Sequence, residues 1–143
     1  MKRIALIGVL SLASLLYGAE WDARNFTKGS FNGRGWATFT RPEKLLFTQA
    51  YYGGWQMSEL LLTTVTCRGD QRCIDYVDSN SKFLPDVDMS DVISGVDEIY
   101  SHSENRSIII IHAIVAFSMK TAGVESQAVD EFLRVARLKA NAK

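Results

Sequence analysis

The polar loop around His102 contains side chains of the kinds that hydrolases use for nucleophilic catalysis. His102 is flanked by Ser101 and Ser103, and Glu104 follows. A serine, a histidine and a carboxylate act as a triad only when the fold sets their geometry, whatever their order in the sequence. We interpret the loop as a polar connection between two helices and predict no catalytic residue in it.

The second histidine, His112, lies inside the nearly unbroken apolar run from Ser107 to Phe117. Its neighbours at helical distance, such as Ile108 and Val115, cannot orient an imidazole or exchange a proton with it. We expect a buried, neutral ring with a lowered pKa, one nitrogen of which bonds a backbone carbonyl or a polar group of a neighbouring helix. The sequence thus predicts a protein that is not an enzyme.

Carboxylates recur at short spacing, at Asp75 and Asp78 and again at Asp86, Asp88 and Asp91. Acid catalysis would need apolar surroundings that raise a carboxyl pKa, and a calcium loop would need closer oxygen ligands and a characteristic glycine. We expect these residues to cap helices and to solvate a helix face. Neither a metal site nor a cofactor is predicted.

Cys67 and Cys73 are the two cysteines of the chain. Zinc would require two further ligands at defined spacing, and a catalytic redox pair usually has the spacing C-x-x-C. In an exported protein, two cysteines with none left over most simply form one disulfide. We predict a local Cys67–Cys73 bridge, which stabilises by about 2 kcal/mol in the chain-entropy model.

The N-terminus has the layout of a secretory signal peptide over residues 1–19. Lys2 and Arg3 precede an uncharged stretch from Ile4 to Tyr17, which closes on Gly18 and Ala19. This stretch falls short of the ~20 residues that a membrane-spanning helix needs. We therefore expect export to the periplasm or secretion, without stable membrane insertion after cleavage.

The charge balance argues against two classes of partner. The chain has 16 basic and 16 acidic residues, and loss of Lys2 and Arg3 with the signal peptide leaves a net charge of −2. The basic residues are dispersed, whereas binding to nucleic acid needs clustered Lys and Arg, and anionic lipid also attracts a basic patch. The expected partner is another protein.

The spacing of the apolar residues predicts the helices that position these side chains. An irregular N-terminal arm over 20–39, with a turn at Asn32-Gly33, precedes a helical domain over 40–138 and a frayed C-terminus over 139–143. Thr40 and Glu43 have the spacing of a capping box, which starts a helix over 42–66. Its apolar stripe contains Phe47, Tyr51, Trp55, Leu62 and Val65.

Gly53 and Gly54 interrupt that helix, and each costs up to ~1 kcal/mol relative to alanine. One interpretation is close helix packing or a local kink. The other is a backbone left open to a ligand beside Tyr51, Tyr52 and Trp55.

Three further helices follow from their patterns. A short helix or turn passes through Ile74 and Val77, and a helix over 89–101 begins at an Asp88 N-cap. The last helix opens at Glu125 or Ser126 and buries Val129, Phe132, Leu133 and Ala136.

The isoleucine run favours a strand by propensity, but it continues to Gly123, a typical C′ glycine of a helix. We predict a helix over about 108–122, capped by Ser107. Because it is apolar all around, other helices should surround it. The expected fold is all-α, a compact bundle of four to five helices with this helix at its centre.

Two stretches carry a resemblance to known proteins. They are N32-G-R-G-W36 leading into P42-E-K-L-L-F-T-Q-A-Y-Y-G-G54, and M89-S-D-V-I-S-G-V-D-E-I-Y100 with Asn105, Arg106 and Ile108. Both resemble small exported bacterial all-helical proteins of unknown function. More loosely, the layout is similar to the Tai-like immunity proteins, which block peptidoglycan amidases of type VI secretion, and to the HdeA-like periplasmic acid-stress chaperones.

The hypothesis for function is a small exported helical binding protein. An inhibitor of a cell-wall hydrolase and an acid-stress chaperone are its alternatives. The residues expected to contribute to recognition are Trp36, Tyr51, Tyr52, Trp55, Tyr100, His102, Asn105 and Arg106. In the alternative structural interpretation, Trp36, Tyr51 and Tyr100 belong to the core and Asn105 fixes the turn between two helices.

Overall fold

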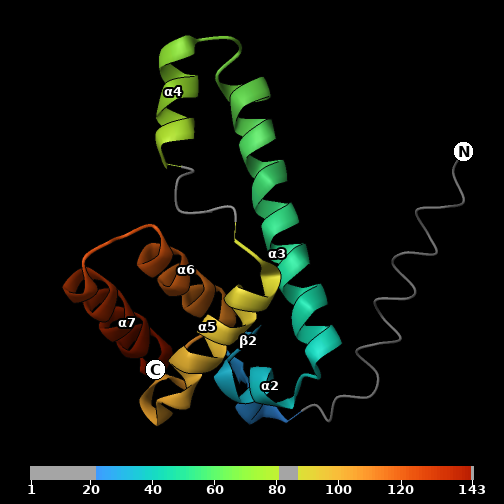
Figure 1. The fold of residues 1–143 in the computed structure, drawn as a ribbon, viewed down its shortest axis with the longest axis vertical. Coiled ribbons are helices and arrows are strands. Elements are labelled where there is room, and N and C mark those ends of the chain that lie inside the picture. Colours follow the sequence, from blue (N-terminus) through green and yellow to red (C-terminus); the bar gives the residue numbers. More distant parts are fainter. Residues whose placement is uncertain (1–21, 81–86, 143) are drawn as a thin grey trace, which may run out of the picture.

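The computed structural model describes residues 22–80 and 87–142, which fold almost entirely into helices (Figure 1). The predicted signal peptide, Asp86 and the side chain of Asp78 lie outside this description. The α-helices are α2 (Gly33–Thr38), α3 (Arg41–Leu61), α4 (Gln71–Asn80), α5 (Met89–Ser101), α6 (Ile110–Thr121) and α7 (Ser126–Asn141). The all-α class is confirmed, and the described residues form six α-helices, including a short one that the sequence did not indicate.

The predicted irregular arm contains a small hairpin followed by α2. Strands β1 (Phe26–Thr27) and β2 (Ser30–Phe31) pair antiparallel after the 3-10 turn η1 (Ala23–Asn25). The hairpin turn lies at Lys28 and Gly29, whose φ angles are +50° and +79°. The turn expected at Asn32-Gly33 is wrong, because Asn32 caps α2 instead of turning the chain.

Asn32 is buried, and its side chain makes four hydrogen bonds. Oδ1 accepts the backbone N–H groups of Arg34 (2.9 Å) and Gly35 (3.2 Å), which caps the N-terminus of α2. Nδ2 donates to the carbonyl of Arg24 (2.9 Å) and to Oγ1 of Thr27 (3.1 Å). One amide therefore joins η1, β1 and α2.

Helix α3 begins at the predicted capping box. The backbone N–H and the hydroxyl of Thr40 each donate to the carboxylate of Glu43, at 2.7 Å. The helix continues through the π-helical turn η2 (Leu62–Thr66), so its extent agrees with the expected 42–66.

The predicted apolar stripe of α3 is wrong beyond Trp55. Thr48 and Tyr52 are the buried residues of the helix, whereas Leu62 and Val65 are exposed. The physical reason is length, because the C-terminal half of α3 rises beyond the other helices, with α4 beside it (Figure 1). We call this part of the molecule, residues 53–77, the extension.

The glycine pair at the start of the extension faces open space. A Cβ atom added at Gly53 or Gly54 would meet no atom within 4 Å. Close helix packing at these glycines is therefore wrong, and their backbone lies open on the surface.

The predicted disulfide is confirmed at the far end of the extension. Cys67 and Cys73 are bonded, with their Cα atoms 5.3 Å apart, across the turn from η2 into α4. Arg68 and Gly69 form this turn with positive φ angles. The predicted short helix is α4, which packs against η2.

Helix α5 matches its expected bounds and supplies much of the core. Asp88 caps it, accepting the N–H of Ser90 at 2.6 Å. Gly95 contacts the ring of Phe117 so closely that an added Cβ would lie 2.0 Å from Phe117 Cδ2. This glycine lets α6 approach α5. The most deeply buried side chains of the core are Trp36, Val92, Val96, Ile108, Ile110, Ala113, Ile114 and Ala116.

The isoleucine run is divided between two conformations. Ile109 forms an isolated antiparallel bridge with Asn32, and α6 begins only at Ile110. The Ser107 cap is therefore wrong, because Ile109 is the N-cap residue of α6 and Ser107 lies in the preceding turn. At the other end Gly123 has a φ of +78°, and its N–H donates to the carbonyl of Lys120 (3.2 Å), which confirms the predicted C′ glycine.

Helix α6 lies between α5 and α7 and is not surrounded by helices. Its buried face carries Ile110, Ala113 and Ile114, but Ile111 is 40% exposed. Helix α7 packs on the opposite side from α5 and buries Val129, Leu133 and Ala136. It extends to Asn141, which includes three residues of the segment 139–143 that was expected to fray.

His112 is half-buried at the edge of this packing. Its ring stacks edge-on against Phe132, with 5.9 Å between centroids, beside a cavity of about 90 Å³ bordered by Lys28 and Lys139. This aromatic contact takes the place of the expected hydrogen bond. Burial and, to a smaller extent, the charge of Lys139 lower the pKa of His112.

This lowered pKa predicts a pH-dependent stability. Above the unfolded pKa of about 6.5, both states hold a neutral ring and the full stability is present. As the pH falls from there toward the lower folded pKa, the unfolded state takes up the proton first and the free energy of unfolding decreases. Urea titrations from pH 7.5 to pH 5 should show a smaller decrease for His112→Gln than for the natural chain. His102→Gln, at the exposed histidine, is the control, and an equal change in both variants would contradict the assignment.

Candidate functional site

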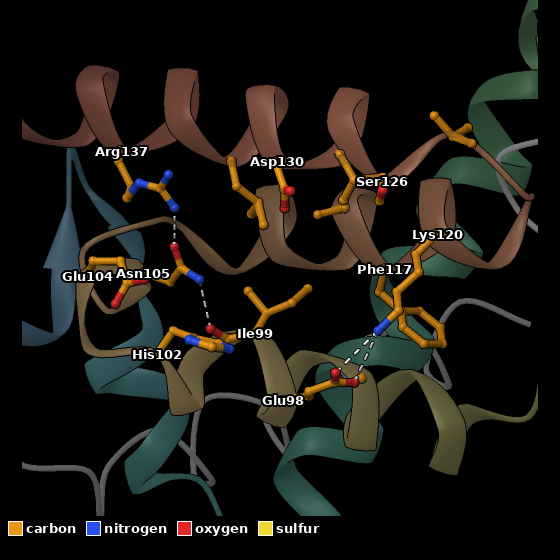
Figure 2. A pocket seen from close by; sticks show the side chains of 15 residues that line it. Glu98, Ile99, His102, Glu104, Asn105, Phe117, Lys120, Ser126, Asp130 and Arg137 are labelled. Carbon is orange, nitrogen blue, oxygen red and sulfur yellow. Dashed lines mark hydrogen bonds and ion pairs between the residues drawn. The ribbon is translucent and has the colours of Figure 1, made fainter.

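A cleft of about 470 Å³ opens between α5 and α7, with α6 beneath it (Figure 2). This volume lies in the range of sites for small ligands or short peptide segments. Apolar groups line part of the cleft, from Ile99, Ala116, Phe117, Val124, Val129 and Leu133. Polar groups complete the lining, from Glu98, His102, Glu104, Asn105, Lys120, Ser126, Asp130 and Arg137.

Asn105 and Arg137 join the two walls at one end of the cleft. Asn105 is buried in the 3-10 turn η4 (Ser103–Asn105), and its Nδ2 donates to the carbonyl of Ile99 at 2.9 Å. Its Oδ1 accepts a hydrogen bond of 2.7 Å from Nη1 of Arg137 (Figure 2). The amide therefore holds the turn after α5 and connects it to α7, as expected for a residue that fixes the turn.

Glu98 and Lys120 connect α5 to α6 at the other end. Nζ of Lys120 lies 3.2 Å from Oε1 of Glu98, and both side chains are largely exposed. Near them, the close contact of Phe117 with Gly95 sets the separation of the two helices. The cleft thus has an ion pair at one end and a buried amide at the other.

His102 lies on the rim of the cleft, without the triad geometry that its neighbours suggest. The hydroxyl of Ser101 donates to the backbone carbonyl of Glu98 at 2.6 Å, which directs it away from the imidazole. His102, Ser103 and Glu104 are exposed. Their arrangement is that of a polar rim.

Trp36, Tyr100 and Arg106 border a second hollow, of about 520 Å³. Nε1 of Trp36 donates to Oδ1 of Asp97 at 2.6 Å, and Nζ of Lys44 lies 2.7 Å from the same oxygen. Lys44 also lies over the Trp36 ring, 5.1 Å from its centroid. Trp36 and Tyr100 are core residues, 1% and 6% exposed, as the structural interpretation expected.

The other three candidate residues form a cluster on α3. The ring of Tyr51 lies 5.8 Å from that of Tyr52 and 6.4 Å from that of Trp55. Tyr52 is buried, with its hydroxyl 3.4 Å from Oγ of Ser118. Nε1 of Trp55 donates to Glu59 at 2.9 Å. These residues line neither of the two hollows described above.

The eight candidate residues therefore fall into three groups. His102 and Asn105 line the cleft, Trp36, Tyr100 and Arg106 line the second hollow, and the α3 aromatics lie apart. Sequence reasoning missed the rest of the polar lining, including Glu98, Lys120, Asp130 and Arg137. The spacing of Glu98 and Asp130 within their helices could have marked them as lying beside the buried face, but the pairing of α5 with α7 has no local signal.

The fold and the cleft define an all-α protein with one disulfide and a ligand-sized groove between two helices. Comparison of the chain with family models, with curated proteins and with solved structures finds no match. Among residues 22–80 and 87–142, no helix combines the length and apolar character that a membrane crossing requires. The same residues contain no cluster of three side chains suited to hold a metal ion.

The amide connection predicts a measurable coupling between α5 and α7. In a double-mutant cycle of Asn105→Ala and Arg137→Met, urea unfolding should give a coupling energy of about 1.5 kcal/mol, because a partly buried, charge-assisted hydrogen bond is lost. The matched cycle uses Glu131→Ala and Arg134→Met, an exposed ion pair on the same helix. It should give a smaller coupling, since water screens that pair. Equal values in the two cycles would contradict the role of Asn105.

Proposed function

We propose that the protein is a small exported binding protein, and that the α5–α6–α7 cleft receives a segment of another protein. The observation that carries the proposal is the composition of the cleft. It has an apolar lining and a rim of charged groups of both signs, which is the anatomy of a protein interface, with an apolar centre and a polar periphery.

The rim indicates what kind of segment fits. Arg137 is engaged by Asn105 and Lys120 by Glu98, whereas Asp130 and Glu104 are exposed at the rim. The matching segment carries an apolar side chain that reaches Leu133 and Val129, flanked by a basic residue that meets Asp130. Such an apolar anchor within a charged border is the usual way that a short segment gains both affinity and register.

Export rests on two features of the sequence and the fold. The basic start, the apolar stretch and the small residues before position 20 have the layout of a signal peptide. The Cys67–Cys73 disulfide supports the same destination, because disulfides persist in oxidising compartments.

The inhibitor and chaperone alternatives differ in when they bind. An inhibitor of a cell-wall hydrolase forms one tight complex at neutral pH, whereas an acid-stress chaperone binds many clients after acidification. The cleft is open in the folded protein, which favours a partner that needs no acid trigger.

An affinity pull-down from periplasmic extract, at neutral and at acid pH, tests the proposal. We expect one stoichiometric partner at neutral pH, and Asp130→Arg should reduce its recovery by about tenfold or more, as the reversal of a rim charge against a basic residue would. Many clients only in acid would instead support the chaperone alternative.

The control is Glu131→Arg, a reversal of the same charge one residue along α7. Glu131 is exposed, pairs with Arg134 and does not line the cleft. Its variant should retain the partner. Recovery of no partner at either pH, or equal losses with both variants, would refute binding at the cleft.

A further inference from the structure

The extension, residues 53–77, carries an unusual share of the exposed apolar surface. In the described part of the chain, ten large apolar side chains are exposed, and six of them belong to the extension. They are Met57, Leu60, Leu61, Leu62, Val65 and Tyr76, each between 47% and 71% exposed. Monomeric proteins rarely expose contiguous apolar patches of more than a few hundred Å².

We propose that this extension pairs with the extension of a second copy of the chain. The first argument is the direction of the side chains. Leu60, Leu61 and Leu62 are consecutive, and at about 100° per residue they span roughly 200° of the helix circumference. A flat surface or a simple groove covers one stripe of about 100°, so no single flat contact can bury all three leucines.

A pair of helical hairpins provides the missing cover. Helix α4 runs antiparallel to α3 and contacts η2, the continuation of α3, beside the disulfide turn (Figure 1). When two such pairs pack together, each helix gains neighbours on two sides, as in a four-helix bundle. The same surface then faces itself across a two-fold axis, so the contact closes after two copies.

The charges of the extension permit this self-association. It contains three acidic residues, Glu59, Asp70 and Asp75, and two basic ones, Arg68 and Arg72, so its net charge is −1. Four of these five follow Cys67 near the turn, while the segment from Gly53 to Thr66 carries Glu59 alone. Two copies can therefore meet along this segment with little repulsion between like charges.

The available area also matches. Six large side chains, each about half exposed, present several hundred Å² of apolar surface, the same order as the ~800 Å² per partner of a standard interface. The disulfide fixes the turn between η2 and α4, so part of the ordering that association requires is already present in the monomer. This surface is separate from the α5–α6–α7 cleft, which stays free for its own partner.

Sedimentation velocity over a concentration series tests the pairing, with protein purified from cells that express the full 143-residue chain. We expect a dimer for the natural chain. Leu61→Glu should raise the dissociation constant of the dimer by about a hundredfold, since each dimer loses two buried side chains and gains two buried charges. The matched control is Leu138→Glu on α7, because Leu138 is 58% exposed and Leu61 is 54% exposed.

Amide hydrogen exchange identifies the surface involved. Residues 53–66 should become more protected as the concentration rises in the natural chain and in Leu138→Glu, but not in Leu61→Glu. Leu61→Glu should also retain any partner recovered through the cleft, which separates this test from that of the proposed function. A natural chain that is monomeric throughout, protection elsewhere in the molecule, or equal weakening by both variants would overturn the pairing.

Discussion

The packing of this protein depends on the backbone of residues 107–109, where two carbonyl groups are satisfied by side chains of other segments rather than by a helix. Residues 107–109 leave the η4 turn through a bend and reach an isolated bridge before α6, where an unpaired peptide group would be costly. Oγ1 of Thr27 donates to the carbonyl of Ser107 at 2.7 Å, and the hydroxyl of Tyr100 donates to that of Ile108 at 3.0 Å. Burial raises the pKa of Tyr100, so the phenol keeps the proton that it donates. Ile109 pairs with Asn32, and the N-terminal hairpin thereby becomes part of the core.

The dependence of residues 107–109 on distant partners explains which elements could be predicted from the sequence. The bounds of helices α5 and α7 could be predicted closely, because both helices have regular apolar spacing. The N-cap Asp88 and the C′ glycine Gly123 act through local backbone geometry, so they also mark helix ends that the sequence alone reveals. The start of α6 could not, because Ile108 and Ile109 have the same side chain as Ile110 and differ only in their distant partners. The hairpin turn was hidden for a related reason. Lysine is uncommon at positive φ, the conformation of Lys28. The Asn-Gly pair at Asn32 is a more typical turn sequence, so the turn was predicted there instead of at Lys28 and Gly29.

The candidate site shows the corresponding limit for side chains. That Asn105 fixes the turn after α5 could be inferred from an amide between two helices. Its bond to Arg137 could not, because the two residues are 32 positions apart and the approach of α7 is set by the packing of Val129 and Leu133. The α5–η4 turn borders both hollows, with Asn105 facing the cleft and Arg106 facing the other side. A change in the conformation of this short turn would alter both hollows together.

Helix α3 is anchored through its first half, by its capping box and by the buried residues Thr48 and Tyr52. The 14 residue steps from Phe47 to Leu61 span about 21 Å at ~1.5 Å per residue. A tilt of about 10° at Phe47 would therefore displace the end of the helix by roughly 4 Å. The helix would pivot about its packed segment, where Phe47 contacts Trp36. Small adjustments in the core are thus magnified at the disulfide turn, whose position in space is governed by side chains that it never touches.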